Sequence, residues 1–166
     1  DVHSINVTSA SDNLHDISML LGIVAIQEHS MSPAVALGVE KELRAHNRRL
    51  FASPAARGAK YSAGVAAVIP SRTPSLPHIP RTQAFTRAQA QGRCIAVQLV
   101  LAKHFSFRLY AAYGYTGGAM SGEAAAQTSR LVRAIRNENQ AGGNPPYMLA
   151  IDLNARTSDI QAIQDI

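Results

Sequence analysis

Three apolar runs, widely separated in the chain, each lead to a polar side chain, and this pattern constrains the fold more than any other feature of the sequence. The first run precedes Glu28, the second ends on Tyr113, and the third leads into Asp152 and Asn154. Continuous apolar runs of this kind are typical of strands that are buried on both faces. A buried carboxylate is strongly disfavoured unless it has a partner charge or a metal. These strand ends therefore predict a divalent-metal phosphoesterase site at the rim of a sheet.

The bulk composition indicates a single globular domain over residues 1–166. The chain is 46% hydrophobic and 5% aromatic, without tryptophan, and a chain of this length can bury a core. Its one cysteine, Cys94, lies in an apolar run, which excludes an intramolecular disulfide and favours a small core residue over a nucleophile. An intracellular location, nuclear or cytoplasmic, is therefore expected. No apolar stretch reaches the roughly 18 residues of a membrane span, so no membrane partner is expected.

The charge is distributed unevenly along the chain. The net charge is +5, and residues 43–122 contain no Asp or Glu, whereas Arg and Lys recur throughout. Such a basic block favours polyanions, and arginine matches phosphate oxygens in a bidentate manner. An ordinary solvated surface is the alternative interpretation. We expect nucleic acid, and DNA in particular, to be the partner, with Arg44, Arg48, Arg49 and Arg93 as binding residues.

Periodicity and capping residues predict alternating strands and helices. Strands are expected at 4–7, 22–26, 51–53, 62–69, 93–102, 105–113 and 147–153, and helices at 11–20, 32–49, 121–138 and from 158. The proline-rich segment 70–92 is expected to be a loop without regular structure. Because only Lys103 and His104 separate two long strands, these should form a hairpin. The mixture predicts an α/β fold with mostly antiparallel sheets covered by helices.

Five short segments, taken in order, resemble the endonuclease/exonuclease/phosphatase superfamily. They are Ile5-Asn6-Val7, Ile23-Val24-Ala25-Ile26-Gln27-Glu28, Ala63-Gly64-Val65-Ala66, Leu109-Tyr110-Ala111-Ala112-Tyr113-Gly114 and Asp152-Leu153-Asn154-Ala155. The likeness is greatest to the apurinic-endonuclease-like domains of non-LTR retrotransposons, which implies that a reverse transcriptase accompanies or follows this domain. It also implies a four-layer α/β/β/α sandwich and a metal-dependent endonuclease that hydrolyses nucleic-acid phosphodiesters.

The resemblance implies a role for each matching polar residue. Glu28 would bind Mg²⁺, with Mn²⁺ as an alternative, and Asn6 would support this metal. Asp152 would orient or deprotonate the attacking water, and Asn154 would hold the phosphate. Tyr113 would contact the phosphate or steady the leaving oxygen. This set suits the reaction, because a metal offsets the charge that develops on the phosphate and a fixed carboxylate aims the water.

Two departures from the superfamily pattern affect these expectations. Ile151 stands where the superfamily usually has glycine, which suggests either crowding at the metal or an altered approach of the backbone. Superfamily members also continue into Ser-Asp and Asp-His motifs that supply a general acid–base histidine, and nothing after Asn154 matches them. The resemblance therefore implies that the chain covers the N-terminal two-thirds of the domain. Weak or no activity is expected, since general acid–base catalysis contributes roughly 10²- to 10⁴-fold.

Other interpretations of the same residues stay open. Glu28 and Asp152 also fit ordinary positions at strand ends and turns, Tyr113 fits a core aromatic, and His29 fits a polar surface better than a metal ligand. At the level of function, a phosphoinositide or sphingomyelin phosphoesterase would share the acidic motifs. A non-catalytic nucleic-acid-binding remnant is the third reading.

Overall fold

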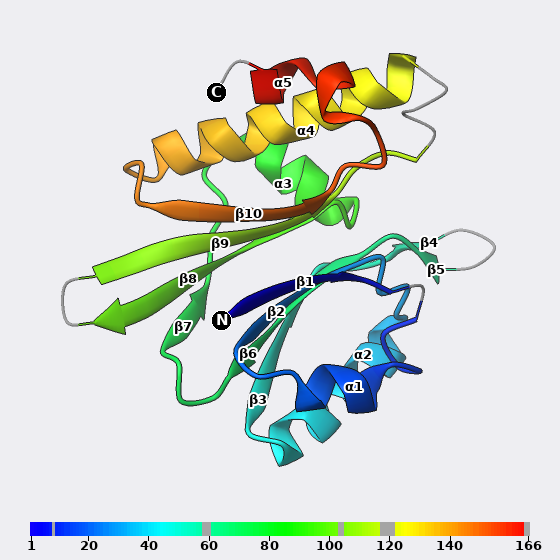
Figure 1. The fold of residues 1–166 in the computed structure, drawn as a ribbon, viewed down its shortest axis with the longest axis vertical. Coiled ribbons are helices and arrows are strands. Elements are labelled where there is room, and N and C mark those ends of the chain that lie inside the picture. Colours follow the sequence, from blue (N-terminus) through cyan, green and yellow to red (C-terminus); the bar gives the residue numbers. More distant parts are fainter. Residues whose placement is uncertain (8, 58–60, 103–104, 117–121, 165–166) are drawn as a thin grey trace.

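Two four-stranded sheets stacked face to face form the centre of the molecule (Figure 1). The structure is a computed structural model that describes residues 1–7, 9–57, 61–102, 105–116 and 122–164. The first sheet has the order β1 (Val2–Asn6), β2 (Ile23–Gln27), β6 (Val65–Pro70) and β3 (Arg48–Ala52). The second has the order β10 (Tyr147–Asp152), β9 (Phe105–Tyr113), β8 (Cys94–Ala102) and β7 (Ser75–Pro77). A short ribbon consists of β4 (Ala56–Arg57) and β5 (Tyr61–Ser62).

The strand pairing is mainly antiparallel, as the sequence predicts. In each large sheet one edge strand is parallel to its neighbour: β1 to β2 in the first and β10 to β9 in the second. The pairs β2–β6, β3–β6, β7–β8 and β8–β9 are antiparallel. The hairpin of β8 and β9 is confirmed, although its expected turn residues, Lys103 and His104, lie outside the described residues.

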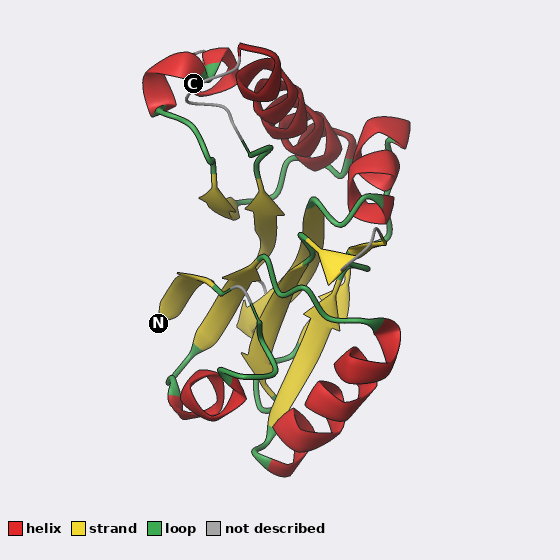
Figure 2. Ribbon diagram, turned by 90° about the vertical axis from the view of Figure 1, so that its right-hand side faces the viewer, coloured by secondary structure: helices red, strands yellow, loops and turns green. Residues whose placement is uncertain are grey.

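Helices cover the outer face of each sheet, which confirms the four-layer sandwich (Figure 2). The helices are α1 (Leu14–Met19), α2 (Pro33–Ala45), α3 (Gln83–Ala90), α4 (Gly122–Ala141) and α5 (Gln161–Gln164), with a 3₁₀ turn at Thr157–Asp159. Helices α1 and α2 pack on β2 and β6 through Ile17, Leu43 and Val68. Helices α3 and α4 pack on β8 and β9 through Phe85 and Ile135. No helix in the described part of the chain combines the length and apolarity that crossing a bilayer requires.

Strand alternation explains why the central strands read as continuous apolar runs. In β6, Val65, Ala67 and Ile69 face the second sheet, whereas Ala66 and Val68 face α1 and α2. Both faces of β6 are therefore buried, because alternate side chains along the strand pack into two different cores. Many of these core positions are alanine or valine, and the aromatic side chains of Tyr113, Phe51 and Phe107 pack with them.

The same alternation separates the candidate site from the helical layer at the end of β10. Ala150 faces the other sheet, whereas Leu149 and Ile151 pack against α3, α4 and α5. Because successive side chains point to opposite faces, Ile151 points away from the face that carries Asp152. The Ile151 side chain therefore does not crowd the face that carries Asp152, and an altered approach of the backbone stays a prediction.

Two expected element boundaries are also wrong. Helix α2 ends at Ala45, because His46 leaves the helical conformation and Asn47 adopts a positive φ of 56°. Arg48 and Arg49 consequently begin β3 instead of closing the helix. Helix α1 begins at Leu14 and not at 11 or 12, with Asn13 as its N-cap. The expected start of the next-to-last helix at 121 lies outside the described residues.

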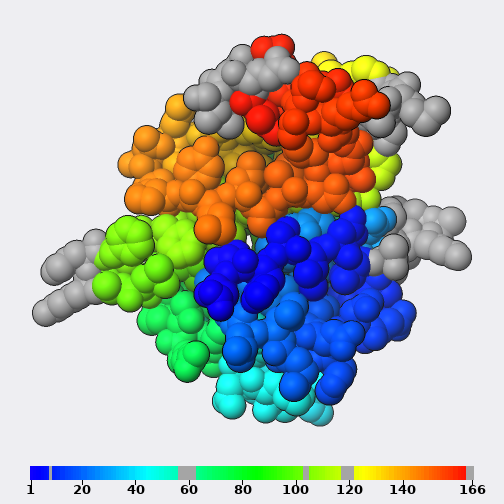
Figure 3. All heavy atoms as spheres, in the orientation of Figure 1, coloured from blue at the N-terminus to red at the C-terminus, as the bar shows by residue number. Residues whose placement is uncertain are grey.

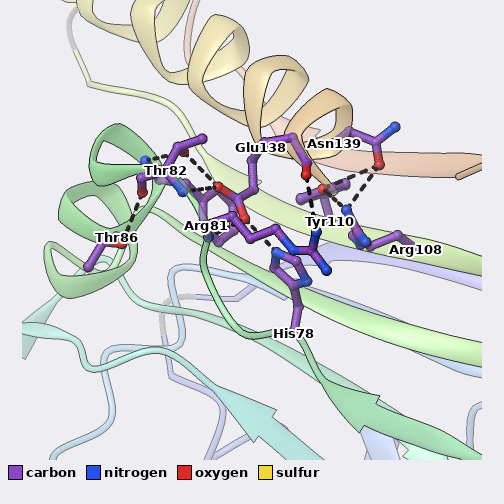
Figure 4. Close-up of polar contacts among 10 residues, drawn as sticks. His78, Arg81, Thr82, Thr86, Arg108, Tyr110, Glu138 and Asn139 are labelled. Carbon is purple, nitrogen blue, oxygen red and sulfur yellow. Dashed lines mark hydrogen bonds and ion pairs between the residues drawn. The ribbon is translucent and has the colours of Figure 1, made fainter. Parts of the chain in front are cut away.

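The segment 70–92 is a third correction, because it contains β7 and α3 instead of an irregular loop. Thr82 caps α3 by accepting a hydrogen bond from the Phe85 backbone N–H. Glu138 of α4 is fully buried and accepts hydrogen bonds from His78 Nε2 (2.6 Å), Arg81 N (2.7 Å), and both Thr82 N and Oγ1 (2.8 and 2.6 Å) (Figure 4). A carboxylate from a distant helix therefore fixes the chain where α3 begins.

Candidate metal and phosphate site

Asn6 and Asp152 meet where the first and second sheets come together. Asn6 Nδ2, at the end of β1, donates a hydrogen bond of 2.5 Å to Asp152 Oδ2, at the end of β10. Gln27 Nε2 donates to the Ala150 carbonyl oxygen across the same seam at 3.4 Å. Figure 3 shows the N-terminal segment in blue lying directly against β10 in orange. Asn6 and Asp152 are 146 positions apart in sequence, so the stacking of the two sheets brings them into contact.

Glu28 and Tyr113 form a second pair at this rim. The Tyr113 hydroxyl donates a hydrogen bond of 3.0 Å to Glu28 Oε2. Tyr113 is the last residue of β9, and Glu28 directly follows β2 with a positive φ of 59°. A positive φ is uncommon for a residue other than glycine and is often found where function demands it. The backbone thus turns sharply at the point where Glu28 presents its carboxylate.

Asn154 joins these pairs. Its backbone N–H donates to Asp152 Oδ1 at 3.0 Å, and its Nδ2 donates to the Gly114 carbonyl oxygen at 3.2 Å. Its side chain also interacts with the Tyr113 hydroxyl. Gly114 is required here, because a Cβ atom at this position would overlap the Leu153 carbonyl oxygen. The structure therefore brings all five predicted catalytic and metal-binding residues into one connected cluster.

The Tyr113 hydroxyl keeps its proton at neutral pH. Burial is the largest effect that raises the pKa of Tyr113, to about 12, and the nearby Glu28 and Asp152 carboxylates add to it. The Asn154 side chain acts in the opposite direction. Because the phenol stays protonated, it serves the site as a hydrogen-bond donor and not as a base.

His29 supports the backbone of the site and is not placed to bind a metal. Its ring is buried; Nδ1 accepts from the Met31 N–H at 3.0 Å, so Nε2 carries the proton and donates to the Ser53 carbonyl oxygen at 3.1 Å. Burial lowers the pKa of His29, which keeps the imidazole neutral. The His29 N–H also bonds to the Gly64 carbonyl oxygen at 3.1 Å. This supporting role was not apparent from the sequence, where His29 reads as a surface residue.

The donor groups of the cluster fit a hard divalent cation. The described residues contain no group of three His, Cys, Asp or Glu side chains that could hold a metal. The cluster instead offers the carboxylate oxygens of Glu28 and Asp152 and the amide oxygens of Asn6 and Asn154. Mg²⁺ prefers oxygen ligands and is commonly held by one or two carboxylates together with water and phosphate. The residues present therefore suit Mg²⁺ better than a nitrogen- or sulfur-ligated metal.

The four predicted nucleic-acid-binding arginines occupy different environments. Arg48 is buried and donates to the carbonyl oxygens of Ser18, Leu20 and Gly22. Arg49 donates to the Thr73 and Ser75 carbonyl oxygens and to the Ser75 hydroxyl. These two guanidinium groups therefore hold β3 to the end of α1 and the turn after it, and to the start of β7 and the loop before it.

Arg93 is the predicted arginine that lies beside the cluster. Its guanidinium carbon lies 5.4 Å from the ring centroid of Tyr113 and 4.4 Å from that of Tyr115, and Nη1 donates to the Gly114 carbonyl oxygen at 3.1 Å. Arg44 lies on α2 and pairs with Glu40 at 2.6 Å on an exposed surface. The cluster thus has one neighbouring cation among the four.

Replacing Tyr113 with phenylalanine should lower the free energy of unfolding by about 1.5 kcal/mol, because a hydrogen bond to a charged group is lost. The wild type should lose further stability as the pH rises from about 10 to about 12, since the unfolded chain then releases the phenolic proton that the folded chain retains. The variant should lack this component. Urea unfolding measured between pH 8 and 12 checks both effects; an unchanged alkaline slope would contradict the assignment.

Sequence comparison and structural comparison give different results for this chain. No family model matches the sequence, and no curated protein matches it. Solved structures do match. A 3′ phosphatase from Neisseria bound to a product DNA hairpin has a TM-score of 0.62 and 16% identity, and the match covers 99% of this chain and 68% of that one. The Xenopus laevis APE2 catalytic domain has a TM-score of 0.66 and 14% identity, with coverage of 93% and 58%.

A truncated TDP2 from Caenorhabditis elegans is also similar, with a TM-score of 0.59, 13% identity, and coverage of 96% of this chain and 64% of that one. The chain therefore shares the fold of these structures and of an endonuclease/exonuclease/phosphatase family protein from Leptotrichia buccalis, which matches with a TM-score of 0.58, 14% identity, and coverage of 99% of this chain and 70% of that one. It spans about 58 to 70% of the length of these four structures. A particular likeness to the retrotransposon members stays a prediction.

Proposed function

We propose that this chain carries the metal- and phosphate-binding residues of a Mg²⁺-dependent phosphodiesterase that hydrolyses nucleic acid, with Mn²⁺ as an alternative ion. The observation that carries the proposal is the cluster at the rim, where Glu28, Tyr113, Asp152, Asn6 and Asn154 are joined by hydrogen bonds. Residues of four different segments would not converge in this way at an ordinary turn. The similar structures include a phosphatase bound to DNA, which supports nucleic acid as the substrate class.

The roles follow from the chemistry of each side chain. A bound Mg²⁺ would offset the negative charge that develops on the phosphate. Glu28 would hold the metal, and Asn6 would orient Asp152 through their hydrogen bond. Asp152 would in turn aim a water molecule at phosphorus and accept its proton. The second N–H of the Asn154 amide would donate a hydrogen bond to a phosphate oxygen, and the protonated Tyr113 would do so if its hydroxyl turned from Glu28 when that carboxylate bound the metal. These oxygens become more negative in the transition state.

We further propose that the chain alone hydrolyses DNA slowly. Three histidine rings form hydrogen bonds with partners outside the candidate site, so they are not placed as its general acid. His3 contacts the Leu21 carbonyl oxygen, His29 contacts the Ser53 carbonyl oxygen, and His78 contacts the Glu138 carboxylate. A protonated imidazole near the leaving oxygen would supply roughly a further 10²- to 10⁴-fold. The accompanying reverse transcriptase and the nuclear or cytoplasmic location stay predictions.

A metal titration of the Glu28→Gln variant tests the proposal. With Mg²⁺ at 100 times its dissociation constant, the wild type should gain about 2.7 kcal/mol of stability. That gain should raise the melting temperature by roughly 5 to 10 °C, given about 2 to 4 °C per kcal/mol for a domain of this size. The variant should lose most of this shift, because its amide cannot replace the carboxylate charge.

The matched control is Glu40→Gln, which removes a carboxylate from the exposed pair with Arg44 on α2. This variant should keep the full Mg²⁺ shift. A shift that is equal in the wild type and in Glu28→Gln would refute the metal site. Steady nicking of plasmid DNA by the wild type at rates typical of nucleases would refute the slow-catalyst part, while leaving the site itself in place.

A further inference from the structure

A groove of about 420 Å³ lies between α3 and α4, the two helices that pack on the outer face of the second sheet. Arg87 and Gln91 line one wall, from α3 and the residue that caps it. Gln127 and Arg130 of α4 line the other wall, and Tyr115 contributes its ring. The lining contains two cations and two amide side chains but no acidic residue. Its chemistry therefore suits an anion.

The two arginines of this groove are available for a ligand. Both side chains are exposed, and their guanidinium groups form no hydrogen bond or ion pair within the part of the chain that the structure describes. Among the described residues, Gln127 makes one long contact of 3.5 Å with the Glu123 carboxylate beside the groove. Two unpaired arginines that line one hollow favour a phosphate, which each can bind through two parallel N–H donors.

A chain of contacts connects this groove to the candidate site. The Tyr113 ring, whose hydroxyl bonds to Glu28, packs against the Arg93 guanidinium. The same guanidinium lies over the Tyr115 ring, and the Tyr115 hydroxyl donates to Gln91 Oε1 at 3.2 Å. Arg93 thus stands between the phosphate-binding residues and the groove. One anionic strand could contact the site, Arg93 and the groove in succession.

The groove is held in shape before any ligand arrives. The buried carboxylate of Glu138 fixes the start of α3 to α4 through its bonds to His78, Arg81 and Thr82 (Figure 4). At the other end of α3, the Tyr115 N–H donates to Thr128 Oγ1 of α4 at 2.9 Å. A preformed groove loses less conformational entropy when it binds a ligand.

We propose that the groove binds backbone phosphates of the nucleic-acid strand whose scissile phosphate lies at Glu28 and Asp152. The choice of nucleic acid rests on the proposed function. Arg87 and Arg130 each contact a phosphate, and the amides of Gln91 and Gln127 add hydrogen bonds to the sugar–phosphate backbone. Arg93 covers one face of the Tyr115 ring, so the groove reads the backbone and not the bases. The occupant is one strand, bound without regard to sequence.

The salt dependence of binding tests this assignment. The probe is a fluorescein-labelled oligothymidylate, measured by fluorescence anisotropy without divalent ions so that no hydrolysis occurs. Each lost phosphate contact should reduce the slope of log K against log salt by about 0.7 for a single strand. The double variant Arg87→Gln/Arg130→Gln should therefore lower the slope by about 1.4 and weaken binding at low salt.

Lys41→Gln is the control, because Lys41 is an exposed cation on α2, in the opposite helical layer. It should leave the slope unchanged. An unchanged slope in the double variant overturns the groove assignment. Inorganic phosphate that binds Arg87 and Arg130 while the oligonucleotide slope stays the same also overturns it, in favour of a small phosphate ligand.

The Mg²⁺ melting shift of the double variant separates this proposal from the proposed function. If the double variant shows a normal Mg²⁺ melting shift and an unchanged salt slope, the metal site is supported and phosphate binding by the groove is refuted. If the salt slope of the double variant is reduced but neither the wild type nor the variant shows a Mg²⁺ melting shift, the groove is supported as a strand-binding surface and the metal site is refuted.

Discussion

Replacing Glu138 with glutamine will lower the free energy of unfolding by about 3 kcal/mol, which is the range for removing one partner from a buried charged network. Glutamine has nearly the same volume, so the loss is electrostatic. The wild-type carboxylate accepts from His78, from the Arg81 N–H and from Thr82. In the variant an NH₂ group must face one of these donors. Guanidinium chloride unfolding followed by circular dichroism measures the change.

Acid unfolding provides an independent readout of the same network. Burial raises the pKa of Glu138, but hydrogen bonds from Thr82, His78 and Arg81 outweigh it, so the pKa lies below its ordinary value. The folded protein therefore binds fewer protons than the unfolded chain in acid, and stability falls as the pH drops through this pKa. The variant should lack this component of the acid dependence.

Glu123→Gln is the matched control, since Glu123 is an exposed glutamate on the same helix. Its stability should change by less than about 0.5 kcal/mol. If Glu138→Gln were as stable as this control, α3 would not depend on the carboxylate. The strand-binding groove would then lose its fixed wall.

The residues of the candidate site could be predicted from the sequence because they lie at the ends of strongly apolar strands. The apolar run that ends on Tyr113 indicates a strand, and side chains alternate between the two faces of a strand. The last residue, Tyr113, faces the other sheet. The five polar residues were expected together for this reason and through the superfamily resemblance. Their contacts agree with that expectation, as the bond between Asn6 and Asp152 shows.

The parts that could not be predicted depend on distant contacts. Helix α3 was missed because prolines dominate the start of segment 70–92 and because part of its N-terminal anchor, Glu138, lies 56 residues beyond Thr82. Arg48 was placed in a helix because cationic residues suit a helix C-terminus, although Asn47 is a residue type that often takes a left-handed backbone just after a helix. Arg48 itself resembles a surface cation, and only the fold reveals the carbonyl oxygens that surround it.

Gly64→Ala will destabilise the protein by about 2 to 6 kcal/mol, because backbone strain and overpacking each cost about 1 to 3 kcal/mol. Gly64 has a φ of +84°, which disfavours a side chain. An added Cβ would lie 2.5 Å from His29 Cε1 and 2.6 Å from Nε2. The ring cannot easily move aside, since it is buried and bonded to Ser53 and Met31.

The effect of Gly64→Ala should also reach the metal site. His29 follows Glu28 directly, and its N–H is bonded to the Gly64 carbonyl oxygen. If the ring and the Gly64 backbone separate, the positive-φ turn at Glu28 loses its support and the Mg²⁺ melting shift should shrink. Gly38→Ala on α2 is the control, because nothing lies within 4 Å of its Cβ position. The Gly38→Ala variant should gain about 0.5 to 1 kcal/mol from helix propensity and keep the full Mg²⁺ melting shift. Equal stability of Gly64→Ala and Gly38→Ala would show that the close approach of Gly64 to His29 is not a constraint.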